Sequence, residues 1–210
     1  MKLRLLIKKL YLDDSKFLDS KLIKEYCKAI NLDYNVAIKY LTSRKYLVRI
    51  LKGTFYKLSM EERKFNKINI NHLEAITESL RMKNITNWYF GLETANKFNN
   101  LTHEYYAIEY VINDKIFRAE PIAILGHKVR FIKLKENLFS FGIKNHNKMR
   151  ISDNEKTLLD TIYLARYDGL SDKEIKNKIA GMIRYCSKEK LFKYAKEYNS
   201  AVKNFVRELF

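Results

Sequence analysis

The sequence is poor in the residues that interrupt or crosslink a chain. It has one proline, Pro121, six glycines and two cysteines, Cys27 and Cys186, in 210 residues. Two cysteines are too few for a disulfide framework, so we expect a reduced, cytoplasmic protein. No stretch rich in Ser, Gly or Pro occurs, which predicts short and partly helical joints between folded parts.

Long apolar runs and negative charge are also scarce. No run approaches the length needed to span a bilayer, and residues 1–9 lack the apolar segment of a secretory signal peptide. The chain has 41 Lys and Arg against 24 Asp and Glu, which gives a formal net charge of +17. We therefore predict no membrane association and a general attraction to polyanions such as nucleic acid.

The signatures of common enzymes are missing. The sequence contains no Gly-x-x-x-x-Gly-Lys phosphate loop, no Gly-x-Gly-x-x-Gly, no Gly-x-Ser-x-Gly and no Gly-Ser followed by Asp-x-Asp. The four histidines, His72, His103, His127 and His146, are far apart, and no Cys-x-x-Cys occurs, so no zinc site is predicted. We expect a nonenzymatic protein without catalytic residues, cofactor or metal.

Residues 15–58 show two helical patterns in close succession. Ser20 is the predicted N-cap of the first helix, and apolar residues recur at helical spacing over residues 22–30. A short turn follows, and Asp33 can accept the free N–H groups that open a second helix over residues 34–45. The pattern predicts a helix-turn-helix whose second helix reads a ligand.

A hairpin follows the two helices. Strand-like runs at residues 46–51 and 54–58 are joined by Lys52-Gly53, a tight-turn signal. An amphipathic helix over residues 3–12 would brace the motif. The order predicts a winged helix-turn-helix domain over residues 1–60. These residues hold 14 Lys and Arg against 5 Asp and Glu, whereas the remaining 150 hold 27 against 19.

The second helix has residues suited to a major groove. Ala37, Tyr40 and Leu41 are predicted to face the core, and the remaining side chains are predicted to point outward. Amide and hydroxyl groups suit base edges, Lys suits phosphate and Ile suits a thymine methyl. The predicted groove-reading residues are Tyr34, Asn35, Ile38, Lys39, Thr42 and Ser43, and the predicted phosphate contacts are Arg44, Lys45, Arg49, Lys52 and Lys57.

Residues 65–210 are predicted to form a second, mixed α+β domain, joined to the first through the charged segment Met60 to Lys64. Gly91 is predicted to form a turn with positive φ between a strand and a helix. The predicted helices cover residues 72–82, 92–98, 156–165 and 171–186, with a last basic helix from Ser187, and the predicted strands cover residues 88–91, 105–112, 115–119 and 129–135.

Two segments of this second domain resemble a known family. Trp88-Tyr-Phe-Gly-Leu-Glu-Thr-Ala95 resembles the Y-x-G-x-x-x-A segment of AbiEi-type antitoxins, and Ile151-Ser-Asp-Asn-Glu-Lys-Thr-Leu-Leu-Asp160 resembles their I-S-D-x-E-K-T-L-x-D helix entry. The resemblance covers nearly the full chain. It implies an antitoxin of a type IV toxin-antitoxin, or abortive infection, system. The N-terminal domain would repress its own operon, and the C-terminal domain would counteract a nucleotidyltransferase-like toxin.

The charged residues of the second segment also have a structural interpretation. Asp153 and Glu155 lie in the first turn of a predicted helix, where carboxylates cap free N–H groups and favour the helix dipole. Lys156 and Asp160 are spaced as an i, i+4 ion pair, which is worth a few tenths of a kcal/mol when exposed. These residues are therefore not interpreted as an acidic catalytic site.

The sequence leaves two other classes of function open. A metal-dependent nuclease could be assembled from acidic residues and a lysine on neighbouring central strands, although the usual Glu-x-Lys spacing is absent. A protein-interaction module could present its basic face to an acidic partner. The hypothesis that the sequence favours is a repressor that binds double-stranded operator DNA, with a homodimer that matches an inverted repeat. The nuclease alternative would use Glu104, Glu109, Asp114, Glu120 and Lys128.

Overall fold

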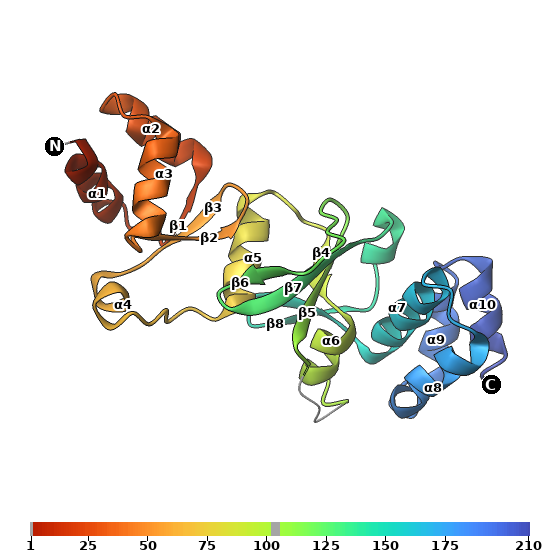
Figure 1. The fold of residues 1–210 in the computed structure, drawn as a ribbon. Coiled ribbons are helices and arrows are strands. Elements are labelled where there is room, and N and C mark those ends of the chain that lie inside the picture. Colours follow the sequence, from red (N-terminus) through yellow and green to blue (C-terminus); the bar gives the residue numbers. More distant parts are fainter. Residues whose placement is uncertain (1, 102–105) are drawn as a thin grey trace. The chain divides into compact units, whose positions relative to one another are not determined.

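The computed structural model describes residues 2–101 and 106–210 and divides the chain into two compact units. Unit 1 is Met1–Asn84 and unit 2 is Ile85–Phe210. Each unit combines helices with a sheet of its own (Figure 1), so the predicted mixed α+β fold class is confirmed. Within the described residues, no helix has both the length and the apolar character needed to cross a membrane.

Unit 1 consists of helices around a three-stranded antiparallel sheet of strand order β1-β3-β2. The two helices predicted after residue 15 and the hairpin that follows them are present at the expected positions. The N-cap of the first of these helices is Asp19, one residue before the predicted Ser20. The elements of unit 1 are α1 (Lys2–Leu12), β1 (Phe17–Asp19), α2 (Ser20–Ala29), α3 (Tyr34–Ser43), β2 (Leu47–Leu51), β3 (Thr54–Lys57), α4 (Met60–Phe65) and α5 (His72–Met82).

The core of unit 1 lies between its first three helices and the sheet. Apolar residues at helical spacing in α1, α2 and α3 pack against one apolar residue from each strand, which is why the amphipathic pattern folds in this way. The short strand β1, which has only three residues, was not predicted from the sequence. Because β1 pairs with β3, the predicted two-stranded hairpin is part of a three-stranded sheet. The buried cluster contains Leu6, Leu10, Leu18, Ile23, Cys27, Ala37, Ile38, Leu41, Leu47 and Phe55.

The boundary between the units differs from the one predicted at Met60 to Lys64. That segment is helix α4, whose N-terminus is capped by Ser59 and Glu62 in a capping box. The next helix, α5, packs beside all three strands of the first sheet and therefore belongs to unit 1. Residues 60–64 were predicted to be a linker because they are charged. Unit 1 instead continues to Asn84, because α5 packs against its sheet.

Unit 2 is built on a six-stranded mixed sheet of order β6-β7-β5-β4-β9-β8, with parallel pairing of β5 with β7 and of β4 with β9. The described elements of unit 2 are β4 (Trp88–Phe90), α6 (Leu92–Phe98), β5 (Ile108–Asn113), β6 (Ile122–Ile124), β7 (His127–Lys133), the 3-10 helix η1 (Glu136–Phe139), β8 (Ile143–His146), β9 (Met149–Ser152), α7 (Asn154–Tyr167), α8 (Asp172–Ile183), α9 (Lys188–Ala195) and α10 (Ser200–Arg207).

Three expectations for unit 2 are wrong. Residues 115–119 form no strand, because the side chain of Asn113 takes up the backbone N–H of Lys115 at 2.9 Å and folds this segment as a turn. The chain from Ser187 forms two helices, since Asn199 caps α10 separately. Gly91 has φ of −125°, so positive φ is not its reason. A Cβ there would lie 2.6 Å from the Ile112 side chain, so close packing requires glycine.

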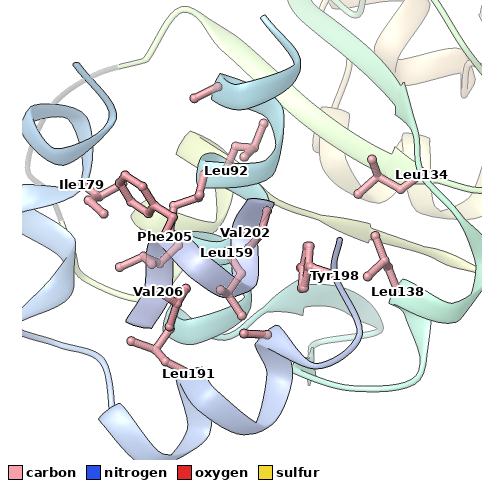
Figure 2. Packing of buried hydrophobic residues seen from close by; sticks show 14 of the residues in the cluster. Leu92, Leu134, Leu138, Leu159, Ile179, Leu191, Tyr198, Val202, Phe205 and Val206 are labelled. Atoms are coloured by element: carbon pink, nitrogen blue, oxygen red, sulfur yellow. The ribbon is translucent and has the colours of Figure 1, made fainter. Parts of the chain in front are cut away.

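The core of unit 2 lies between one face of the sheet and helices α7 to α10. Figure 2 shows Ile179 of α8 beside Phe205 of α10 on one side of the cluster and Leu134 and Leu138 beside Tyr198 on the other side; all belong to one buried cluster. Phe205 and Val206 of the last helix are fully buried there, which gives the C-terminal helix a structural role. Residues 105–107, at the start of the predicted strand over 105–112, are not part of β5, and residue 105 itself lies outside the described residues.

Candidate nucleic-acid interface

The turn before α3 fixes where this helix begins. The side chain of Asp33 accepts the N–H of Val36 at 2.9 Å, and the N–H of Leu32 donates to the carbonyl of Cys27 at 2.9 Å. Ala37 and Leu41 are fully buried against the core. The short turn therefore holds α3 across α2 with one face packed and the opposite face in solvent.

The exposed face of α3 carries polar and small apolar side chains. Asn35, Lys39 and Ser43 are exposed, as predicted, and they follow one another at i, i+4 and i+8. Val36 is 54% exposed on the same side, in the first turn of the helix. Val36 was not among the predicted reading residues, although its i, i+3 and i+7 spacing to Lys39 and Ser43 places it on the same face.

The remaining three predicted reading residues are not free to reach a ligand in the same way. Ile38 is 7% exposed and belongs to the core cluster, so the prediction that it points outward is wrong. The helix packs along a wider apolar stripe than Ala37, Tyr40 and Leu41 alone, which includes position 38. Tyr34 is half-buried, and its hydroxyl donates to Ser20 Oγ at 3.0 Å. Thr42 donates to the carbonyl of Ile38 at 2.8 Å.

The hairpin tip lies against the start of α2. Gly53 adopts φ of +84°, and its carbonyl accepts both the N–H of Ser20 at 2.8 Å and the Ser20 hydroxyl at 3.2 Å. Positive φ is the left-handed region, which glycine adopts without a steric penalty. Lys52 beside it is exposed. The tip therefore presents a cation at a position fixed by two hydrogen bonds.

The other predicted phosphate contacts differ in whether their charged groups already have a partner in the protein. Arg44 and Arg49 are exposed, and the Arg49 guanidinium lies 5.4 Å from the centroid of the Phe55 ring. Lys45 is exposed, has φ of +56° and donates to Asn66 Oδ1 at 2.5 Å. A groove of about 460 Å³ runs between the end of α3 and strand β2, and its lining includes Thr42, Lys45, Val48, Arg49 and Asn66.

Lys57 is the predicted phosphate contact that the structure contradicts. Its ammonium donates to the carbonyls of Leu10, at 2.8 Å, and of Asp13. These carbonyls lie at the end of α1, where a cation satisfies free acceptors and opposes the helix dipole. Burial lowers the pKa of Lys57, although the charges of Asp13 and Asp14 oppose the shift. Lys57 therefore closes α1 and is not presented to a ligand.

The segment Ile151 to Asp160 forms a buried polar network in unit 2. Lys156 and Asp160 of α7 are both fully buried, with Nζ 3.6 Å from Oδ1. Tyr89 of β4 donates to Asp160 at 2.8 Å, and Tyr198, between α9 and α10, donates to it at 2.6 Å. Burial raises the pKa of both tyrosine hydroxyls and lowers the pKa of Lys156. The ion pair is thus a core contact and not the exposed pair considered from the sequence.

The first turn of α7 continues this network. Asp153 Oδ1 accepts the N–H of Lys156 at 2.9 Å, so the predicted capping role of Asp153 is confirmed. Glu155 instead accepts the N–H of Ser187 at 2.8 Å, which satisfies a donor at the start of α9. Lys190 Nζ lies 3.9 Å from Asp153 and 3.7 Å from Glu155. These carboxylates hold helices together, because each has a structural partner.

The residues considered for a nuclease do not converge. Glu109 accepts hydrogen bonds from Thr94 and Lys97, each at 2.8 Å. In the pairing of β5 with β7, Lys128 lies opposite Ile108 and Glu109 lies opposite Val129. Successive residues of a strand point to opposite faces, so the side chains of Glu109 and Lys128 lie on different faces of the sheet. Among the described residues, no three His, Cys, Asp or Glu could together hold a metal ion. His103 and Glu104 lie outside the described residues.

Comparison with known proteins shows that the fold of this chain is similar to that of a solved structure. No protein-family model matches the chain, and no curated protein matches it. Among solved structures, the chain is similar to the RV2827C protein from Mycobacterium tuberculosis, with a TM-score of 0.61 and 11% sequence identity. The match covers 99% of this chain and 75% of that chain. It supports the mixed α+β fold described above.

Proposed function

We propose that unit 1 contains a winged helix-turn-helix that binds double-stranded DNA, and that the chain is a sequence-specific transcriptional repressor of the AbiEi antitoxin type. The observation that carries the proposal is the solvent-exposed polar face of α3 beside a basic hairpin held against the start of α2. Helix-turn-helix proteins place the second helix of the pair in the major groove, where its exposed side chains reach base edges.

The chemistry of the α3 face suits base readout. The amide of Asn35 can pair with adenine through one donor and one acceptor, and the methyl groups of Val36 can contact a thymine methyl. Ser43 and Lys39 add hydrogen-bond donors further along the same face. Val36 thus takes the apolar role that the sequence assigned to Ile38, because Ile38 is part of the core.

The exposed cations around α3 would hold the DNA backbone. Arg44 and Lys45 follow the end of α3, Arg49 lies on β2, and Lys52 lies at the hairpin tip. Contacts of this kind carry no sequence information, but they fix the position of the protein on the duplex and make affinity depend on salt. The excess of positive charge in residues 1–60 supports the same proposal.

The antitoxin part of the proposal rests on the two segments that resemble AbiEi-type proteins. In this proposal the chain represses its own operon, and unit 2 counteracts a nucleotidyltransferase-like toxin. Two copies would bind an inverted repeat, since one chain supplies one reading helix. The segment Ile151 to Asp160 contributes to this activity by holding unit 2 together, because its charged residues are occupied in the core.

The test is a mobility shift with the full chain on its own upstream DNA and on a scrambled duplex at about 150 mM salt, where nonspecific binding is weak. Asn35→Ala should reduce the preference for the upstream sequence by roughly 5- to 150-fold, the equivalent of about 1–3 kcal/mol for one base contact. Lys52→Ala should weaken binding to both duplexes and lower the salt slope by about one.

Two lysines serve as matched controls for the charge change. Lys28→Ala alters an exposed lysine at the end of α2. Its effects on duplex affinity and on the salt slope should both be smaller than those of Lys52→Ala. Lys57→Ala should lower stability while keeping the salt slope, because Lys57 caps α1. Equal binding of the two duplexes by the unaltered chain would refute sequence-specific repression. Absence of binding at low salt would instead favour a protein-interaction module.

The toxin part has a separate readout. Growth should be arrested by the neighbouring nucleotidyltransferase-like gene alone and restored by co-expression of the full chain. Asp160→Ala should weaken this rescue because it destabilises unit 2, whereas Asn35→Ala should leave rescue unchanged. Rescue that disappears in Asn35→Ala would mean that unit 1, and not unit 2, counteracts the toxin.

A further inference from the structure

Unit 2 contains a groove that the proposed function does not use. It has a volume of about 640 Å³ and lies on the sheet face formed by β5 and β7, beside α7. Tyr110 of β5 and Arg130 of β7 are paired in register on this face, and Tyr163 of α7 also lines the groove. The volume is within the range of sites that enclose one small molecule.

One edge of the groove is held in place by a buried asparagine. Asn113 is fully buried, and its side chain donates to the carbonyls of Ile116, at 2.9 Å, and Ile132, at 3.2 Å. The N–H of Arg118 donates to the carbonyl of Phe131 at 3.1 Å. These contacts fix the backbone of residues 115–118 beside β7, so that Phe117 and Arg118 line the groove.

The charge of the groove is complementary to an anion. Its cations outnumber its two carboxylates, Glu93 and Asp168, by three. Arg130 and Arg118 are exposed, and a planar guanidinium can bind a phosphate through two parallel hydrogen bonds. The basic residues along the groove are Arg118, Arg130, Lys133, Lys135 and Lys178, and of the two on β7 Arg130 is on the same face of the sheet as Tyr110 while Lys133 is on the other.

Aromatic rings line the same groove. Phe117 is 64% exposed and Tyr167 is 84% exposed, although large aromatic side chains usually bury most of their surface. Exposed rings next to guanidinium groups form the kind of surface on which a nucleobase stacks. The groove therefore combines a phosphate-binding and a base-stacking surface within one small volume.

Glu93 supplies a polar group that lacks a partner. Its Oε2 atom is buried and accepts no hydrogen bond from the described residues. Glu93 lines the groove together with Tyr110 and Arg130, which are paired in register on β5 and β7. Burial raises the pKa of Tyr110, the charge of Glu93 adds to the shift, and the charge of Arg130 opposes it. A buried acceptor without a partner is unfavourable unless a ligand or water satisfies it. An amino group on a nucleobase is a donor of the required type.

We propose that this groove binds a free nucleoside triphosphate whose base carries an amino group. The base would stack on the exposed aromatic rings with its amino edge toward Glu93, and the phosphates would contact Arg118 and Arg130. The site is separate from the α3 face, and the inference is independent of DNA binding. A single strand of nucleic acid is less well suited, because the stacking and phosphate-binding residues are grouped in one volume of about 640 Å³.

Calorimetric titration of the full chain, without DNA, tests the proposal. ATP, GTP, CTP, UTP and inorganic tripolyphosphate are titrated separately at physiological salt. At least one of the three amino-bearing nucleotides should bind ten-fold or more tightly than both UTP, which lacks the amino group, and tripolyphosphate, which lacks the base. Tripolyphosphate that binds as tightly as the nucleotides would overturn the proposal, because charge alone would then explain binding. No heat of binding at 1 mM nucleotide would overturn it as well.

Three variants separate the contributions. Arg130→Ala should weaken nucleotide binding ten-fold or more, whereas Lys176→Ala, an exposed lysine of α8 that does not line the groove, should weaken it less than two-fold. Glu93→Met, which has no carbonyl or carboxylate oxygen to accept from the amino group, should remove the preference over UTP and leave tripolyphosphate weaker than the nucleotides. Circular dichroism of each variant checks that it is folded. Equal losses in Arg130→Ala and Lys176→Ala would overturn the assignment of the site.

Discussion

At the scale of single residues, Glu62 shows how a buried charge is stabilised. Its carboxylate is 3% exposed and accepts the N–H groups of Ser59 and Asn69, each at 2.8 Å, and the Tyr56 hydroxyl at 2.9 Å. Burial acts to raise the pKa of Glu62, but these hydrogen bonds outweigh it and hold the pKa below its usual value. Glu62 thus joins α4 to the sheet of unit 1 as a carboxylate.

This arrangement predicts a pH dependence of stability. A depressed folded-state pKa stabilises the fold above the unfolded pKa of about 4.3, and the contribution is lost as the pH falls through the folded-state value. Glu62→Gln should therefore lower the free energy of unfolding by about 1–3 kcal/mol at pH 7. The difference from the unaltered chain should shrink at pH 3.

Urea unfolding followed by far-UV circular dichroism at pH 7, 5 and 3 measures this difference. Glu61→Gln is the matched control, because Glu61 is the exposed neighbour in the same helical turn. It should change stability by a few tenths of a kcal/mol at each pH. An undiminished effect of Glu62→Gln at pH 3 would show that the charge of Glu62 does not contribute.

Residue types alone did not decide which side chains of unit 1 are available. Asn35, Lys39, Ser43 and Lys52 are exposed as the sequence predicted. Lys57 is of a residue type that suits a phosphate contact, but its ammonium donates to carbonyls at the end of α1. One of these carbonyls belongs to Leu10, which is 47 residues away in the sequence. Contacts at this sequence separation have no local signal, so the pattern of a strand could not indicate them.

At the scale of secondary-structure elements, the Lys156–Asp160 pair connects α7 to β4 and to the segment between α9 and α10. Asp160 receives hydrogen bonds from Tyr89, which is 71 residues away, and Tyr198, which is 38 residues away. Lys156 Nζ is 3.4 Å from the Tyr198 hydroxyl and 4.5 Å from the centroid of the Phe141 ring. The carboxylate has more strong partners than the ammonium.

The two members of the pair should therefore differ in their effect on stability. Asp160→Ala leaves a buried ammonium without its counter-charge, and we expect a loss of about 3–5 kcal/mol. Lys156→Met leaves a carboxylate that still accepts two tyrosine hydroxyls, and we expect about 1–2 kcal/mol. The Lys156→Met, Asp160→Leu double variant should lose less than the sum of the single losses.

Chemical unfolding monitored by the fluorescence of Trp88, the single tryptophan, reports this series because Trp88 lies in unit 2. Losses that are equal for the two single variants would argue against the assigned hydrogen bonds of Asp160. An additive double variant would show that the two charges do not interact. Helices α6, α7 and α8 and strands β5 and β7 were predictable from periodicity, and β4 from its run of aromatic residues. Strands β6, β8 and β9 have three or four residues each and no such run, and the break between α9 and α10 was missed.

At the scale of the whole molecule, the chain consists of two units with separate cores, and the boundary follows packing and not charge. The sequence placed it at residues 60–64 because the segment is charged, and a second core was expected after it. Helix α5 packs beside β1, β2 and β3, so unit 1 needs the residues that follow the charged segment.

This boundary can be tested with fragments. Residues 1–84 should fold alone, because the fragment retains the core cluster and α5. Residues 1–60 should be unstable, since loss of α5 exposes the apolar surface that it covers on the strands. Dispersion of amide signals in two-dimensional NMR spectra compares the fragments directly. Well-dispersed spectra from both would show that α5 is dispensable and would return the boundary to residue 60.

The attachment of the hairpin tip has a thermodynamic consequence. Ser20 donates two hydrogen bonds to the Gly53 carbonyl, so the backbone beside Lys52 is ordered before any ligand arrives. Binding of a ligand to Lys52 therefore does not include the loss of conformational entropy on ordering this loop, which for a flexible segment is about 1–2 kcal/mol per residue. Ser20→Ala removes the hydroxyl bond and keeps the N–H bond, so it should loosen the tip only in part and slow association by a small factor, measured by stopped-flow mixing with duplex DNA.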